Sequence, residues 1–179
     1  MLKSRIILIS LLIMSLFLFV LLYSTTDRPN TIEEAMKEAG IEVAEIIHHQ
    51  IINIHNNDSV VIYKLKELNG VRIGLVNEST YGWKWKQHLG DIRMTGELRE
   101  DFSSEYISLP EKKYSVLFGS IFNNELESVT VSNPFDMEKY VDLVKIDDTL
   151  TVWFTKWNID DRRIIVKASG KDRFINDEM

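Results

Sequence analysis

The sequence predicts a mainly β protein, an antiparallel meander or sandwich-like domain with one short N-terminal helix, preceded by a single transmembrane helix. Near the start, the eighteen residues Ile6 to Tyr23 carry no charge and have the length of a bilayer-spanning helix. Short segments rich in branched and aromatic residues follow, separated by polar turns. These connections are too short for the helical crossovers of a parallel sheet, so antiparallel pairing is expected.

The apolar run, residues 6–23, is interpreted as a transmembrane anchor or an uncleaved signal. A helix rising about 1.5 Å per residue would reach roughly 27 Å, close to the thickness of the hydrocarbon core. Lys3 and Arg5 precede the run and acidic residues follow it, so the positive-inside rule leaves residues 1–5 in the cytoplasm. No Ala-x-Ala-like cleavage site follows, which favours retention. The predicted location is the cell membrane, single-pass, with the C-terminal part extracytoplasmic.

The outer chain begins with a short stalk, residues 24–30, and continues as one extracytoplasmic globular domain, residues 31–179. Thr31 and Glu34 have the spacing of a capping box, which predicts the start of a helix. Gly40 then stands where a helix C-terminus needs a positive φ. The helix has about eight residues and must pack against the domain to persist.

A series of β segments is expected beyond Gly40. Asn69-Gly70 is the strongest hairpin signal in the chain, and His88 to Ser104, with little periodicity, is interpreted as a long loop. Met137 to Val144 also fits helical spacing. The predicted strands are Ile41 to His49 with its continuation Gln50 to His55, Ser59 to Leu65, Val71 to Asn77, Tyr81 to Gln87, Glu105 to Leu109, Tyr114 to Phe122, Leu126 to Val131, Val141 to Ile146, Thr149 to Trp157, Ile164 to Ser169 and Arg173 to Ile175.

Composition restricts the class of function. The chain is 45% hydrophobic and 27% charged, which is typical of a globular domain. It has no cysteine, which excludes thiol catalysis, disulfides and cysteine-type zinc sites. Two of the 21 Lys and Arg residues precede the apolar run, so the rest of the chain carries 19 against 27 Asp and Glu, a net charge of −8. Nucleic acid is therefore not an expected partner.

No standard catalytic or cofactor motif occurs: there is no phosphate-binding loop, no nucleophile elbow, no zinc-protease helix and no EF-hand. His48, His49 and His55 are candidate metal ligands by residue type. Six residues of strand span roughly 20 Å, which is too far for His49 and His55 to bind one ion unless the strand bends at Gln50. Paired carboxylates such as Asp147-Asp148 and Asp160-Asp161 are most simply turns. No catalytic residue, metal or cofactor is predicted.

The tryptophans are the candidate binding residues, for a protein partner or a glycan. Trp83 and Trp85 alternate with Lys84 and Lys86, so one side of their strand is aromatic and the other cationic. Trp153 and Trp157 are four residues apart, so in a strand their side chains also lie on the same side. Indole faces stack on sugars, but they equally fill a core, and core packing is the favoured interpretation.

A resemblance follows from a set of local sequences. The Thr31-capped helix, Tyr81-Gly82-Trp83-Lys84-Trp85, Leu117 to Ile121, Leu126 to Val131 and Thr151 to Phe154 together resemble small, uncharacterised exported or membrane-anchored proteins of spore-forming Gram-positive bacteria. Their late Asp-x-x-Gly hairpin is altered here to Ser169-Gly170-Lys171-Asp172. The resemblance implies a setting and no chemistry.

By elimination, the sequence favours a non-enzymatic, membrane-anchored extracytoplasmic domain that binds an envelope protein or acts as an accessory part of an envelope process. One alternative is a module that binds cell-wall glycan through exposed tryptophans. Another is a hydrolase with an unrecognised carboxylate site.

Overall fold

A computed structural model describes residues 10–20, 29–66, 70–92, 101–122, 125–134, 138–158, 163–170 and 174–178. It contains two short α-helices, one over residues 10–20 and α2 over Ile32–Glu38. None of the helices in these ranges has the length and apolar character needed to cross a bilayer. Both ends of the predicted anchor, residues 6–9 and 21–23, lie outside the described residues, as do 1–5 and 24–28. The transmembrane helix therefore stays a prediction.

The domain is mainly β, as predicted, and its strands form three antiparallel sheets of four strands each. The first sheet has the order β1-β2-β3-β4, the middle sheet β5-β6-β10-β9 and the last sheet β12-β11-β7-β8. Their bounds are β1 Val43–Asn53, β2 Asp58–Leu65, β3 Val71–Ser79, β4 Gly82–Ile92, β5 Phe102–Leu109, β6 Tyr114–Ile121, β7 Leu126–Ser132, β8 Lys139–Tyr140, β9 Asp142–Lys145, β10 Thr151–Asn158, β11 Ile165–Gly170 and β12 Phe174–Glu178, with a 3-10 turn at Pro110–Lys112.

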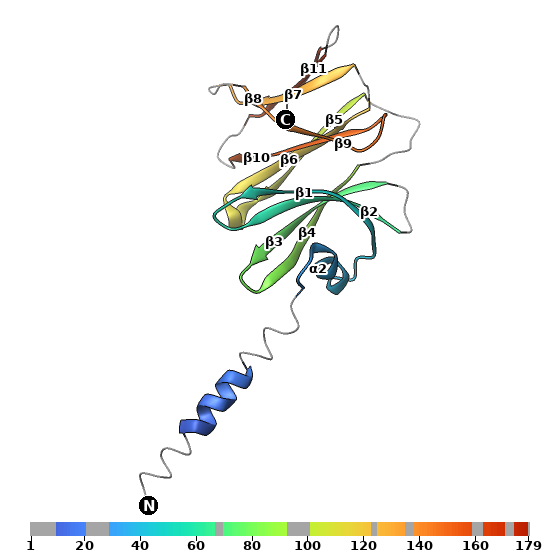
Figure 1. The fold of residues 1–179 in the computed structure, drawn as a ribbon. Coiled ribbons are helices and arrows are strands. Elements are labelled where there is room, and N and C mark those ends of the chain that lie inside the picture. Colours follow the sequence, from blue (N-terminus) through green and yellow to red (C-terminus); the bar gives the residue numbers. More distant parts are fainter. Residues whose placement is uncertain are drawn as a thin grey trace, which may run out of the picture.

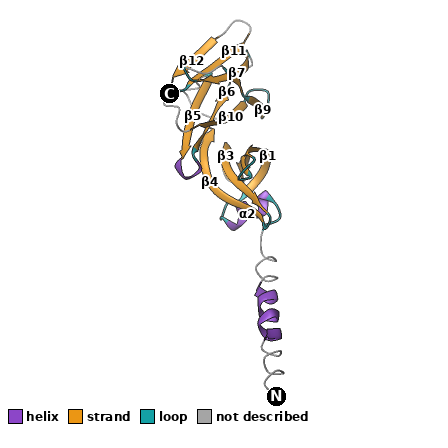
Figure 2. Cartoon of the chain, turned by 90° about the vertical axis from the view of Figure 1, so that its left-hand side faces the viewer, coloured by secondary structure: helices purple, strands orange, loops and turns teal. Residues whose placement is uncertain are grey.

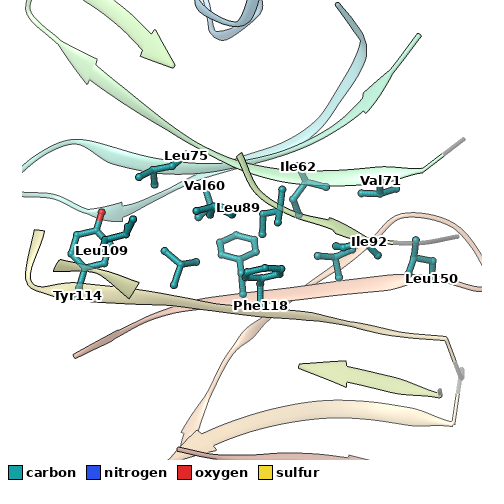
Figure 3. Packing of buried hydrophobic residues seen from close by; sticks show 14 residues of the cluster. Val60, Ile62, Val71, Leu75, Leu89, Ile92, Leu109, Tyr114, Phe118 and Leu150 are labelled. Carbon is teal, nitrogen blue, oxygen red and sulfur yellow. The ribbon is translucent and has the colours of Figure 1, made fainter. Parts of the chain in front are cut away.

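The three sheets are stacked, and α2 covers the outer face of the first sheet (Figures 1 and 2). One apolar cluster joins the first sheet to the middle sheet, with Val60 and Ile62 on one side and Tyr114 and Phe118 on the other (Figure 3). A second cluster joins the other face of the middle sheet to the last sheet. The molecule is thus a sandwich with an additional layer.

The two central strands of the middle sheet, β6 and β10, are covered on both faces, and their sequences reflect this position. Every residue of β6 is buried, and β10 is buried at most of its positions. Strands covered on two sides read as continuous apolar runs instead of alternating ones. Gly119 is required here, because a Cβ at that position would lie 1.9 Å from the Ser103 carbonyl oxygen.

Helix α2 begins as the sequence predicts. The Thr31 hydroxyl oxygen accepts a hydrogen bond from the Glu34 backbone N–H at 3.1 Å, and Gly40 has a φ of +77°. The Glu34 carboxylate accepts from the Asn30 N–H, one residue before the N-cap, instead of closing the usual reciprocal box. Met36 is fully buried against the first sheet, so packing holds this short helix.

A buried polar cluster ties the first sheet to the middle sheet at one end of their shared core. The Asp58 carboxylate is fully buried, accepts from the Tyr114 hydroxyl at 2.8 Å and pairs with Lys112 at its other oxygen. Asn77 also donates to it at 3.2 Å. Burial, and then the hydrogen bond to Asp58, raise the pKa of Tyr114. A buried carboxylate needs such partners, so removing one is strongly destabilising.

Several local predictions need correction. β1 is one strand from Val43 to Asn53, so the β segment predicted from Ile41 does continue through Gln50, although it ends at Asn53 and not at His55. The register is unbroken from His49 to Ile51, so no bend at Gln50 brings His49 and His55 together. The predicted loop from His88 to Ser104 is wrong at both ends: β4 runs to Ile92 and β5 starts at Phe102, while residues 93–100 lie outside the described part. Lys64 of β2 pairs with Val71 of β3, which confirms the predicted hairpin, although Asn69 itself is outside the described residues.

Candidate functional site

A cleft opens at one edge of the stack, where β9 covers only part of β10 in the described structure. β9 pairs with β10 only as far as Asp142↔Phe154, although β10 continues to Asn158. The preceding residue, Val141, still donates to Val129 of the last sheet, so the chain changes sheets between Val141 and Asp142. Among the described residues, no strand pairs with β10 beyond Phe154 on this side.

The edge strands of the two outer sheets form the walls of this cleft. Gln50, Ile51 and Ile52 of β1 lie on one side, Lys139 and Tyr140 of β8 on the other, and Phe154, Thr155 and Lys156 of β10 form its floor. The Gln50 amide donates to the Asp142 carboxylate at 2.9 Å and so links β1 to β9 at the closed end. The cleft is an open slot between two sheet edges.

Two lysines give the slot a positive charge. Lys139 Nζ lies 3.5 Å from the Thr155 hydroxyl, and Lys156 Nζ lies over the Tyr114 ring at 5.2 Å from its centroid. In the described ranges, no carboxylate forms an ion pair with either ammonium group. Of the described residues that line the slot, Asp142 is the one with a carboxylate. The balance of two ammonium groups against one carboxylate contrasts with the acidic chain as a whole.

Size and exposure limit what the slot can hold. Its volume is about 170 Å³, below the roughly 300–1,000 Å³ of pockets that enclose a small-molecule ligand. Its rim carries apolar side chains in contact with solvent: Tyr140 is 74% exposed and Ile51 50% exposed. Such a shallow slot suits a segment of a larger partner better than an enclosed substrate.

The structure places Trp153 and Trp157 in the core between the middle and last sheets. Trp153 is fully buried, stacks on Phe102 with 5.9 Å between ring centroids, and donates from Nε1 to the Ser103 carbonyl at 3.3 Å. Trp157 is 8% exposed in the same cluster. Neither indole offers a face to a ligand.

Trp83 and Trp85 are half-buried on the outer face of the first sheet and pack beside α2. Trp85 meets Tyr63 edge-on, with 5.8 Å between centroids, and its indole lies over Gly74. Trp83 meets His49 edge-on at 6.1 Å. A glycan platform would therefore depend on the remaining exposed parts of these two rings, on a face separate from the slot.

His48, His49 and His55 do not form a cluster. His49 lies beside Trp83 on the outer face of β1, and His55 is in the turn after β1. His48 lies on the inner face, with 6.1 Å between its ring centroid and that of Phe154. The described residues contain no group of three potential metal ligands. Asp160 and Asp161 lie outside the described residues.

Asp147 forms a turn, as predicted, between β9 and β10. Its carboxylate accepts hydrogen bonds from the Thr149 N–H at 2.7 Å, the Thr149 hydroxyl at 2.8 Å and the Leu150 N–H at 2.9 Å. The Thr149 hydrogen bonds, the backbone one first, hold the pKa of Asp147 below its usual range. The carboxylate thus has a structural task at this corner.

Comparison with known proteins adds no relative: no family model, no curated protein and no solved structure matches the chain.

The slot residues are not among the binding residues that the sequence predicts, although one signal is present. Lys156 interrupts a strand whose neighbours Thr155 and Trp157 are buried. A lysine is rarely placed within a buried strand unless its head reaches solvent, so it marks an open edge. The mixed pattern of Met137 to Val144 marks the other side, where the chain changes sheets.

Proposed function

We propose that the chain is a single-pass, membrane-anchored protein whose folded domain lies outside the cytoplasmic membrane and binds another protein of the cell envelope through the slot. The basic head with Lys3 and Arg5, followed by an uncharged run, supports the anchor and its orientation. The resemblance to exported proteins of spore-forming bacteria supports the same setting. The proposed role is that of an accessory or binding domain, without catalysis of its own.

The observation that carries the proposal is the open slot with its exposed apolar rim. Tyr140 and Ile51 expose large apolar surfaces on opposite walls, beside hydrogen-bonding groups such as Gln50. Interfaces favour this combination of an aromatic anchor with polar groups around it. The glycan-binding alternative has weaker support, because Trp153 and Trp157 are buried.

The test places a photoreactive amino acid at Tyr140 in the full-length chain, expressed in its own cells. A matched control places it at Tyr106, which is 55% exposed on β5, at the opposite edge of the middle sheet. We expect a discrete protein adduct from position 140 and none from position 106. Equal adducts from both positions, or none from 140, would contradict the proposal.

The orientation is tested separately on wall-stripped cells. Protease added from outside should digest the domain and leave a C-terminal tag unprotected. Full protection of the tag would place the domain in the cytoplasm and overturn the proposed location. A mature N-terminus near Asp27 would replace anchoring with cleavage.

A further inference from the structure

Along the slot, β10 has backbone hydrogen-bonding groups with which no described strand pairs. The Ile146 N–H donates to the Leu150 carbonyl at 2.9 Å, which shows that the Leu150 backbone is directed towards β9. Alternate residues of an antiparallel strand direct their N–H and C=O groups to the same side. The backbones of Val152, Phe154, Lys156 and Asn158 are therefore directed to this edge.

In the described ranges, the first two of these residues have a partner strand on this side and the last two do not. Val152 pairs with Val144 and Phe154 with Asp142, where β9 ends. Beyond that point, the Thr155 hydroxyl is the one donor among the described residues to the Lys156 carbonyl, at 3.5 Å. Within the described part of the chain, the N–H groups of Lys156 and Asn158 have no backbone partner on this side. Such an edge is a template for another strand.

Charge determines which strand fits. A residue added opposite Lys156 would direct its side chain to the same side of the sheet as the Lys156 ammonium group. The next residue, opposite Thr155, would direct its side chain to the other side, where Lys139 contacts the Thr155 hydroxyl. Two consecutive acidic residues would thus each meet one ammonium group that has no carboxylate partner in the described ranges.

We infer that the slot binds an extended peptide segment of a partner protein by strand addition to β10, and that this segment carries two consecutive Asp or Glu residues. The inference rests on the proposed function and specifies the chemistry of the partner. Backbone hydrogen bonds to Lys156 and Asn158 supply affinity, and the lysines on the two sides of the sheet select the acidic pair. Ile51 and Tyr140 exclude water at the rim.

The first test pans a phage library of random peptides on the full-length chain in nanodiscs. Parallel panning uses the double variant K139E/K156E and a control double variant, K84E/K86E, whose lysines are exposed on β4 at the opposite edge of the stack. We expect the parent and the control to select peptides with adjacent acidic residues, and K139E/K156E to select none of them. A selected synthetic peptide should bind about tenfold more weakly to K156A alone.

The second test separates strand addition from simple charge attraction. N-methyl groups are placed on alternate amides of a selected peptide, in two versions that block one edge of the strand or the other. One version should lose binding and the other should keep it, because only one edge of an added strand faces β10. Equal effects of the two versions would overturn the inference.

Hydrogen exchange adds a measurement on the protein itself. In the free chain, the amides of Lys156 and Asn158 should exchange faster than those of Val152 and Phe154, and the selected peptide should slow the first pair. Slow exchange at Lys156 and Asn158 in the free chain would show that the edge is already paired, and would overturn the inference.

The outcomes distinguish this inference from the proposed function. If photo-crosslinking from Tyr140 captures a partner but panning selects no acidic pair, the proposed function stands and the peptide chemistry is wrong. If both fail, both are wrong. If the slot is filled by a second copy of the chain, the parent self-associates and K139E/K156E does not, which also overturns the inferred partner.

Discussion

Gly74 and Trp85 are packed so closely that the effect of substituting one on the free energy of unfolding must depend on the other. A Cβ added at Gly74 would lie 2.2 Å from Cη2 and 2.8 Å from Cζ3 of the Trp85 indole. Neither atom belongs to a flexible chain end, so Gly74→Ala must displace the ring or separate β3 from β4. Overpacking of this kind costs about 1–3 kcal/mol.

Removal of the indole should reverse this effect. Trp85→Ala deletes a half-buried ring that contacts Tyr63 and packs beside α2, and we expect it to cost about 2–3 kcal/mol, below the roughly 3–5 kcal/mol of a fully buried aromatic. In that background, the new Cβ of Gly74→Ala enters the vacated space. Alanine is also favoured over glycine within a strand by roughly 0.5–1 kcal/mol. The double variant should therefore be no less stable than Trp85→Ala, which gives a coupling of about 2 kcal/mol.

The assay is urea unfolding of the four full-length proteins in one detergent, followed by far-UV circular dichroism so that loss of an indole does not alter the probe. Gly70→Ala serves as the matched control, because its nearest neighbour to a new Cβ is the Ile92 carbonyl oxygen at 3.8 Å, an ordinary contact. Its effect should be the same with and without Trp85. If Gly74→Ala costs the same in both backgrounds, the packing argument is wrong.

Two further predictions concern the core and a turn. Trp153→Ala should lower the free energy of unfolding by about 3–5 kcal/mol, because the ring is fully buried, whereas the half-buried Trp83→Ala should cost clearly less; equal losses in thermal melts would contradict this. Asp147→Ala should cost about 0.5–1 kcal/mol at pH 7, since its hydrogen bonds are exposed to solvent. Because the pKa of Asp147 is lowered in the folded state, this difference should be complete above the ordinary aspartate pKa near 4 and decline as pH falls through the folded value, so a difference that grows towards low pH would refute it.

Local signals in the sequence predicted those parts of the fold that depend on neighbours along the chain. The Thr31 cap, the φ of Gly40 and the turn at Asp147 are each determined within a few residues, and the structure has all three. The antiparallel character was predictable for the same reason, since short connections allow no other pairing.

Features that depend on distant packing were not predictable. The extension of β4 past His88 is one example, because register shifts near Gly74 interrupt the alternation of its side chains. Leu89 and Ile92 therefore lie in the core although the sequence around them has no period-two pattern. The apolar runs of β6 and β10 predict only that each face of these strands packs against another part of the chain. That the covers are two further sheets follows from contacts between residues far apart in sequence.

The slot is hidden from sequence analysis because it arises from a difference in length between strands of different sheets. β10 has eight residues and β9 has four, and neither number is unusual alone. A domain selected only for stability would extend β9 along β10 and pair the remaining backbone groups, since exposed edges invite aggregation. This domain instead moves the chain into the last sheet at β8 and places Lys139 and Lys156 beside the opening. Charged edge residues protect against unspecific pairing, yet these two have no carboxylate partner within the described part of the chain, in a protein rich in carboxylates. A conflict between local stability and the observed structure is most often found at a functional site. The open edge and its two lysines therefore form the part of the surface where we expect selection for binding.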